Sequence, residues 1–105
     1  MIRVVGFYRW VDGATFDHEY YNSEHMRLTR ELLGPRGLLR LESDRYLSGA
    51  PPVAGEIIAA SHAYFPSMDI ARSAVAAAAG ALMTDVAKYT SLKPELLFAE
   101  VSSHG

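Results

Sequence analysis

The chain has 105 residues, of which 50% are hydrophobic and 21% are charged, and its formal net charge is −2. This composition is typical of a folded protein and excludes an intrinsically disordered chain. The length predicts a single domain over residues 1–105. The basic residues form no cluster of the kind that binds nucleic acid or anionic membranes. The absence of cysteine excludes disulfides, thiolate nucleophiles and thiolate metal sites.

The sequence also gives expectations about the location of the protein. It contains no apolar run of the roughly 20 residues that a membrane-spanning helix requires. Its first residues lack the basic-then-apolar pattern of a secretion signal. We therefore expect a cytoplasmic protein with neither a nucleic acid nor a membrane as partner.

The first two predicted elements are a strand and a helix. Residues 2–10 are rich in β-branched and aromatic side chains and precede an Asp-Gly turn at residues 12–13, which predicts a strand. Between residues 15 and 33 apolar side chains recur at helical spacing, so we expect a helix with Thr15 as its N-cap. The Gly-Pro pair at residues 34–35 is expected to end this helix.

Two strands joined by a loop follow the first helix. Residues 38–47 alternate apolar and charged side chains, which is typical of a half-exposed strand. Residues 48–52 contain glycine and two prolines and predict a loop. Residues 56–65 predict a strand that is largely apolar on both faces, and Pro66 ends it.

A second helix and a last strand complete the chain. Ser67 is the expected N-cap of an alanine-rich helix, and Gly80 is a candidate break within that helix. Residues 95–102 predict the fourth strand. The resulting order, βαββαβ, predicts a ferredoxin-like α+β fold in which a four-stranded antiparallel sheet carries two helices on one face.

The open face of this sheet predicts the oligomeric state. The first, third and fourth strands are apolar on both faces, so the face without helices would expose a large hydrophobic patch. Two sheets that close face to face would hide this patch in a shared barrel. We therefore expect a homodimer of the dimeric α+β barrel type.

Three local patterns resemble the EthD family of dimeric α+β barrel proteins, and the resemblance covers nearly the whole chain. The patterns are FDHEYY at residues 16–21, EHMRL at residues 24–28, and Asp85 followed by a Tyr-Thr pair at residues 89–90. Arg27 stands where the family commonly has proline. The resemblance implies a small cytoplasmic dimer whose relatives include lactone isomerases, polyketide cyclases, cofactor-independent monooxygenases, decarboxylases and proteins linked to ether degradation.

His25 is the central candidate for catalysis. Helical spacing would place His18, Tyr21, His25, Leu28 and Leu32 on one face of the first helix. An imidazole that titrates near neutrality is suited to acid–base work on an acidic C–H or a lactone oxygen. The neighbouring tyrosine would then bind a substrate oxygen as negative charge develops. The alternative role of His25 is that of a partly buried packing residue.

Asp85 is the candidate partner of His25. A carboxylate on the second imidazole nitrogen would orient the ring and fix its tautomer. The two side chains should then lie within hydrogen-bonding distance or one water apart. Alternatively, Asp85 holds a helix end by hydrogen bonding.

Further residues are expected to bind the substrate. Tyr8 and Trp10 share one face of the first strand, which we expect to line a cavity beneath the helices, although ordinary core packing is the alternative. Tyr89 and Arg27 complete the predicted binding set. No cofactor is expected, because the chain has no phosphate-binding glycine loop, and its histidines lack the spacing of a metal site.

Three functions fit these residues. The first is a cofactor-independent isomerase, cyclase, decarboxylase or monooxygenase acting on a small hydrophobic oxygenated molecule such as a lactone or a polyketide-like aromatic. The second is a non-catalytic protein that binds a similar ligand. The third is haem binding through His25 and Trp10, which we rank last.

Overall fold

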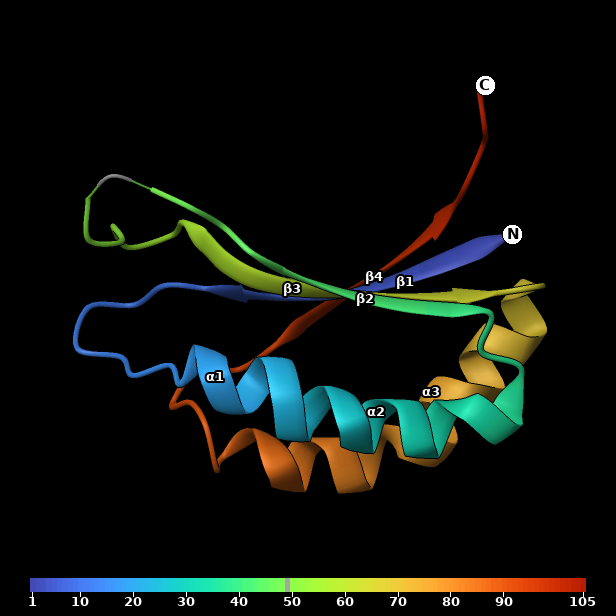
Figure 1. Cartoon of the computed structure of the whole chain (residues 1–105), viewed down its shortest axis with the longest axis horizontal. Coiled ribbons are helices and arrows are strands. Elements are labelled where there is room, and N and C mark those ends of the chain that lie inside the picture. The colour runs from blue at the N-terminus through green and yellow to red at the C-terminus, as the bar shows by residue number, and fades with distance from the viewer. Residues whose placement is uncertain (49) are drawn as a thin grey trace.

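The computed structural model describes residues 1–48 and 50–105. One sheet carries all helices on a single face, as Figure 1 shows. Its strands are β1 (Ile2–Arg9), β2 (Arg40–Arg45), β3 (Ile57–Phe65) and β4 (Glu95–Glu100). The helical layer contains α1 (His18–Tyr20), the π-helical turn η1 (Tyr21–His25), α2 (Met26–Leu33), the 3-10 turn η2 (Gly34–Arg36) and α3 (Met68–Val86).

The sheet has the strand order β2-β3-β1-β4, and every neighbouring pair is antiparallel. This is the ferredoxin-like arrangement that the sequence predicts. The central strands are β1 and β3, whereas β2 and β4 form the edges. Each predicted strand extends one or more residues beyond the ladder at one or both ends, because side-chain pattern alone does not show where pairing stops.

The first helix begins later than predicted. Asp17, rather than Thr15, is its N-cap, and the Asp17 carboxylate accepts a hydrogen bond from the Tyr20 backbone N–H at 3.0 Å. The carbonyl of Thr15 instead accepts the Thr90 hydroxyl at 2.6 Å. Thr15 therefore ties the start of the helix to the segment that follows α3, a long-range contact that local sequence does not reveal.

Gly37 ends the first run of helices, directly after η2. This residue has a φ of +93°, and an added Cβ would lie 2.8 Å from Ile70 Cγ2. Both the left-handed backbone and the close approach of α3 therefore require glycine here.

The helix α3 agrees with the predicted cap but not with the predicted break. The Ser67 hydroxyl accepts the Ile70 backbone N–H at 3.3 Å, which confirms the N-cap. The helix continues through Gly80, because this exposed position lies among alanines with high helix propensity. The loop predicted at residues 48–52 joins β2 to β3, and Gly49 lies outside the described residues.

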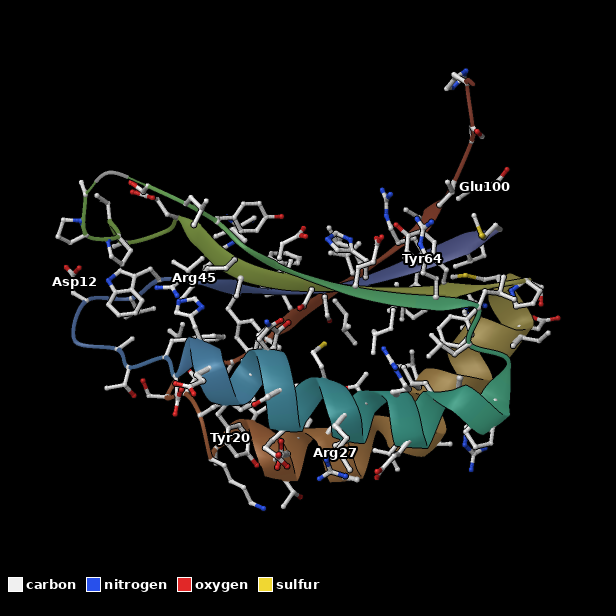
Figure 2. The ribbon with its side chains drawn as sticks, in the orientation of Figure 1. Asp12, Tyr20, Arg27, Arg45, Tyr64 and Glu100 are labelled. Atoms are coloured by element: carbon white, nitrogen blue, oxygen red, sulfur yellow. The ribbon has the colours of Figure 1, made fainter. Side chains whose placement is uncertain are left out.

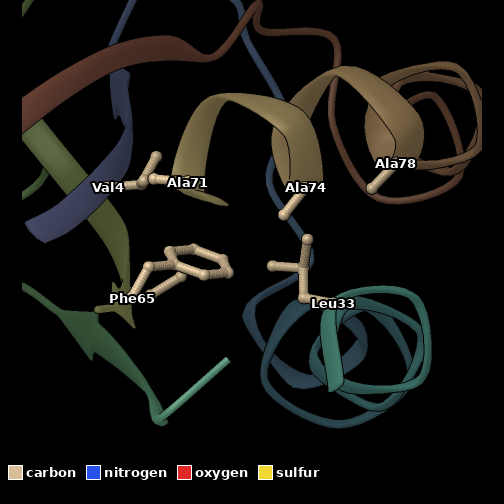
Figure 3. Close-up of a cluster of buried hydrophobic side chains, with 7 residues drawn as sticks. Val4, Leu33, Phe65, Ala71, Ala74 and Ala78 are labelled. Carbon is tan, nitrogen blue, oxygen red and sulfur yellow. The ribbon is translucent and has the colours of Figure 1, made fainter. Parts of the chain in front are cut away.

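Two buried clusters lie between the sheet and the helices. We call the first the apolar core, and Figure 3 shows Phe65 from β3 facing Leu33 and the small residues of α3. We call the second the aromatic core. The apolar core contains Val4, Leu33, Ala63, Phe65, Ala71, Ala74 and Ala78. The aromatic core contains Tyr8, Tyr21, Ile58, Ala59, Val86, Tyr89 and Leu92.

The open face of the sheet is less hydrophobic than predicted. Charged side chains of β2 lie on it, and the guanidinium of Arg40 covers the Tyr64 ring at 4.3 Å. Arg9 covers the Phe7 ring in the same way at 5.3 Å. On the edge strand β4, three neighbouring apolar side chains, Leu96, Leu97 and Phe98, are exposed. Among residues 1–48 and 50–105, no helix has the length and hydrophobicity needed to cross a membrane.

Candidate active site

A π-helical turn sets the position of His25. The Met26 backbone N–H reaches back to the Tyr21 carbonyl, five residues earlier, so the turn over Tyr21–His25 is wider than an α-helical one. The Thr29 hydroxyl donates to the His25 carbonyl at 2.7 Å and supplies that carbonyl with a partner. Wide turns of this kind occur frequently at functional sites.

The wide turn changes which residues face the sheet. One extra residue in a turn rotates all later positions by about 100° around the helix axis. Leu28 and Leu32, which the sequence places on the buried face, are therefore only half-buried. Thr29 and Leu33 are buried in their place. The buried face consists of Tyr21, His25, Thr29 and Leu33.

His25 and Asp85 form a buried pair. The His25 Nδ1 lies 2.8 Å from Asp85 Oδ2, and each side chain is only 7% exposed. This distance is the one expected if the carboxylate orients the imidazole. Since an ionised carboxylate only accepts hydrogen bonds, Nδ1 carries the proton and Nε2 is the ring nitrogen left for a ligand.

The second oxygen of Asp85 is also occupied. The Tyr20 hydroxyl donates to Asp85 Oδ1 at 2.9 Å, and Lys88 Nζ lies 3.6 Å from the same oxygen. The sequence alone does not single out Tyr20. Its only local signal is its place beside Tyr21 in the aromatic pair, because the contact with Asp85 joins residues 65 positions apart.

Burial and hydrogen bonding set the charges of the pair. Burial lowers the pKa of His25 below its usual value, and the opposing effect of Asp85 is smaller. Burial raises the pKa of Asp85, but hydrogen bonds from His25 and Tyr20 bring the net pKa below its usual value. Near pH 7 the site therefore holds a neutral imidazole beside an ionised carboxylate.

Two tyrosines extend the site toward the sheet. The hydroxyls of Tyr8 and Tyr89 are hydrogen-bonded to each other, and the Tyr89 ring packs on His25 with 4.7 Å between ring centres. The Asp17 backbone N–H holds the Tyr89 carbonyl at 2.7 Å. Burial raises the pKa of Tyr8 to about 12 and also raises that of Tyr89, so both phenols keep their protons at neutral pH.

A small cavity of about 150 Å³ adjoins His25 between the sheet and the helices. Its polar lining side chains are Tyr8, His25, Thr29 and Ser61, and the Thr29 proton is already donated to His25. Wider surface hollows elsewhere do not include His25. The rest of the cavity lining is apolar: Val4, Gly6, Leu33, Ala63, Val75, Ala79, Leu82, Met83, Val86, Pro94 and Leu96.

Of the predicted binding residues, only Tyr8 lines this cavity, and the other four lie outside it. Tyr89 packs on the His25 ring instead. Trp10 is half-buried against the aromatic core. Arg27 is exposed and paired with Glu24 and Glu31, and Figure 2 shows it on the side of the helical layer that is remote from the sheet. Tyr21 stacks on His25, with 5.6 Å between ring centres, and its hydroxyl is buried without a hydrogen-bond partner.

The described residues do not fit the metal and haem alternatives. In the part of the chain that the structure describes, no three His, Asp or Glu side chains gather as metal ligands. Haem would require both a free imidazole nitrogen and space for a tetrapyrrole. The His25 Nε2 meets the first need, but a cavity of about 150 Å³ does not meet the second.

Comparison with solved structures confirms the predicted resemblance. The chain is similar to an EthD-like protein from Ralstonia eutropha JMP134, with 27% identity, a TM-score of 0.82, and coverage of 99% of this chain and 94% of that one. An EthD family protein from Bacillus halodurans C-125 has 21% identity and a TM-score of 0.69, with 97% and 99% of the two chains covered.

A third similar structure shares the fold alone. It is a dimeric ferredoxin-like protein of unknown function from Bacteroides fragilis NCTC 9343, with 11% identity, a TM-score of 0.58 and 95% of both chains covered. No family model and no curated protein sequence matches the chain significantly.

Proposed function

We propose that the chain is a cofactor-independent acid–base enzyme that acts on a small, mostly apolar molecule with an acidic C–H beside a carbonyl group. One observation supports this proposal above the others: the buried His25–Asp85 pair stands at the wall of an apolar cavity. His25 itself lines this space, and because Asp85 holds Nδ1, Nε2 is the ring nitrogen left to react.

Each group has a role in this chemistry. The neutral His25 accepts a proton at Nε2, and Asp85 stabilises the resulting imidazolium through Nδ1. As the C–H bond breaks, its electron pair moves toward the carbonyl oxygen. With Tyr89 donating to the Tyr8 oxygen, the Tyr8 proton is free to hydrogen-bond this developing oxyanion. The imidazolium then returns the proton to another carbon, so the step is an isomerisation that needs no oxidant.

The cavity limits the size of the substrate. Apolar cavities of about 150 Å³ in other proteins bind benzene. The cavity beside His25 has the same volume, about 150 Å³, so it suits a single ring or a short branched chain. Small lactones and cyclic ketones fit this limit. Two of the lining residues, Met83 and Leu96, are about half exposed, so the cavity reaches the surface at these side chains.

The proposal includes a homodimer. The edge strand β4 exposes 53% of Leu96, 57% of Leu97 and 37% of Phe98, and exposed apolar side chains on an unpaired edge are typical of an interaction surface. The similar Bacteroides protein is described as dimeric. Light scattering at micromolar concentration should give twice the 11.5 kDa of one chain. A monomeric mass would contradict the dimer.

Isomerisation of cyclohex-3-enone to cyclohex-2-enone tests the catalytic proposal, because this reaction moves one proton within a single-ring ketone. We expect wild-type protein to accelerate it and His25→Gln to lower the rate about 10²–10⁴-fold, the usual contribution of a general base. His62→Gln is the matched control, because His62 Nε2 pairs with Asp44 at 2.7 Å on the open face of the sheet.

Two outcomes would contradict the enzyme. Equal rates in wild type and His25→Gln would remove the catalytic role of His25. Binding of phenol in the cavity, measured by calorimetry, without turnover of this ketone, lactones such as α-angelica lactone or other acidic C–H compounds would favour the non-catalytic ligand carrier.

A further inference from the structure

The candidate site contains a tyrosine that neither lines the cavity nor touches His25. Tyr20 is half-buried on the remote side of the helical layer, where Figure 2 shows it. Its hydroxyl donates to Asp85 Oδ1 at 2.9 Å, while Asp85 Oδ2 receives His25 Nδ1 at 2.8 Å. The Tyr20 ring is also stacked on Tyr89, with 5.9 Å between ring centres. The Asp85 carboxylate on α3 therefore accepts one hydrogen bond from Tyr20 on α1 and one from His25 on η1.

We infer that Tyr20 is a positioning residue that acts on His25 through Asp85, by fixing the carboxylate and taking up part of its negative charge. The inference rests on the proposed function for the use of His25 as a base. It adds a residue that would set the strength of that base without contacting the substrate.

The direction of the effect follows from electrostatics. A hydrogen bond to a carboxylate stabilises the anion, so its loss makes the carboxylate more basic. The more negative Asp85 would then stabilise the imidazolium of His25 more strongly. Removing the Tyr20 hydroxyl should therefore raise the pKa of His25, whereas removing the charge of Asp85 should lower it.

The other groups around His25 do not explain such a change. Tyr21 stacks on one side of the imidazole and Tyr89 packs against another. Burial raises the pKa of both phenols, so they stay neutral while His25 titrates. Lys88 lies 3.6 Å from Asp85 Oδ1 but is 64% exposed, which weakens its effect.

NMR titration of the histidine ring protons tests the inference without any substrate. The chain has four histidines, and the signal lost in His25→Gln identifies His25. We compare wild type with Tyr20→Phe, Asp85→Asn and the double variant. Tyr64→Phe is the matched control, because the Tyr64 hydroxyl donates to Glu42 Oε1 at 3.1 Å on the open face.

We expect the pKa of His25 to rise in Tyr20→Phe, to fall in Asp85→Asn and to stay unchanged in Tyr64→Phe. In the Asp85→Asn background, Tyr20→Phe should cause no rise, because the carboxylate that carries the effect is gone. An unchanged or lower pKa in Tyr20→Phe, or an equal rise in both backgrounds, would overturn the inference. If His25→Gln still isomerises the ketone normally, the proposed function fails while the titration still decides the role of Tyr20.

Discussion

The two ends of the space between sheet and helices are built from different side chains. At the apolar core, Ala71, Ala74 and Ala78 are almost fully buried, so α3 lies close to Phe65. Toward the C-terminal end of α3, Leu82 and Val86 are larger and a cavity opens beside His25. Close packing around Phe65 thus fixes the helices that hold the cavity and the His25–Asp85 pair.

The largest effect should come from emptying the apolar core. Phe65 is fully buried, so Phe65→Ala should lower the free energy of unfolding by about 3–5 kcal/mol, because it removes apolar contacts and leaves a cavity. Urea denaturation measures this loss. Val53→Ala, at a position that is 63% exposed, should change stability by less than about 0.5 kcal/mol. Equal losses of unfolding free energy in Phe65→Ala and Val53→Ala would show that Phe65 contributes no more to stability than an exposed loop residue, which would contradict the packed core.

A substitution that fills part of the cavity beside His25 should weaken ligand binding more than it lowers stability. Gly6 lines the cavity with a backbone that any residue can adopt, and an added Cβ would lie 3.3 Å from Ser61 Oγ and 3.6 Å from Leu96 Cδ2. Gly6→Ala should weaken phenol binding about tenfold, or about 1.4 kcal/mol, because the methyl group occupies ligand space. Calorimetry measures both affinities. Unchanged affinity would place the ligand elsewhere.

The buried imidazole should give this end a pH dependence. Burial lowers the pKa of His25 in the folded chain, so the unfolded chain binds the proton first, at its pKa of about 6.5. The stability from neutral His25 is complete above about pH 6.5 and is lost as the pH falls toward the lower folded-state pKa. The melting temperature of wild type should therefore fall on acidification below this pH more than that of His25→Gln. Parallel curves would show that His25 does not contribute.

The smallest effect should come from the hydroxyl of Tyr21. This group is buried without a hydrogen-bond partner, so Tyr21→Phe removes a desolvated polar atom while the ring still stacks on His25. We expect stability to stay within about 0.5 kcal/mol of wild type or to rise slightly. Thermal denaturation checks this. A clear loss of ketone turnover at unchanged stability would support the substrate-positioning role that the sequence suggested, whereas a clear loss of stability would contradict the absence of a hydrogen-bond partner.

Local signals predicted most of the fold. Strand composition and the Ser67 cap depend on neighbours in sequence, and the structure confirms the βαββαβ order and this cap. Two predictions were wrong: Thr15 as the N-cap of the first helix, and a break of the second helix at Gly80. The first depends on contacts between Thr15 and the segment after α3, and the second on an alanine-rich helix that tolerates one glycine.

The site was harder to predict because its parts meet only in the folded chain. His25 and Asp85 are 60 residues apart, and only the resemblance to EthD proteins joined them beforehand. The π-helical turn shifted the buried face by one residue, which ordinary helical spacing does not foresee. Tyr20 is the neighbour of the predicted residue Tyr21 in the sequence. Its proposed role depends on its hydrogen bond to Asp85, which lies on the neighbouring helix α3.

A crystal structure of the protein soaked with phenol tests the central claim most directly, because phenol matches the cavity in size and carries one hydroxyl. The account predicts the phenol ring within the cavity, with its oxygen in hydrogen-bonding distance of His25 Nε2 and the Tyr8 hydroxyl. A closed cavity in which Nε2 is hydrogen-bonded to the protein would contradict the account and make His25 a structural residue.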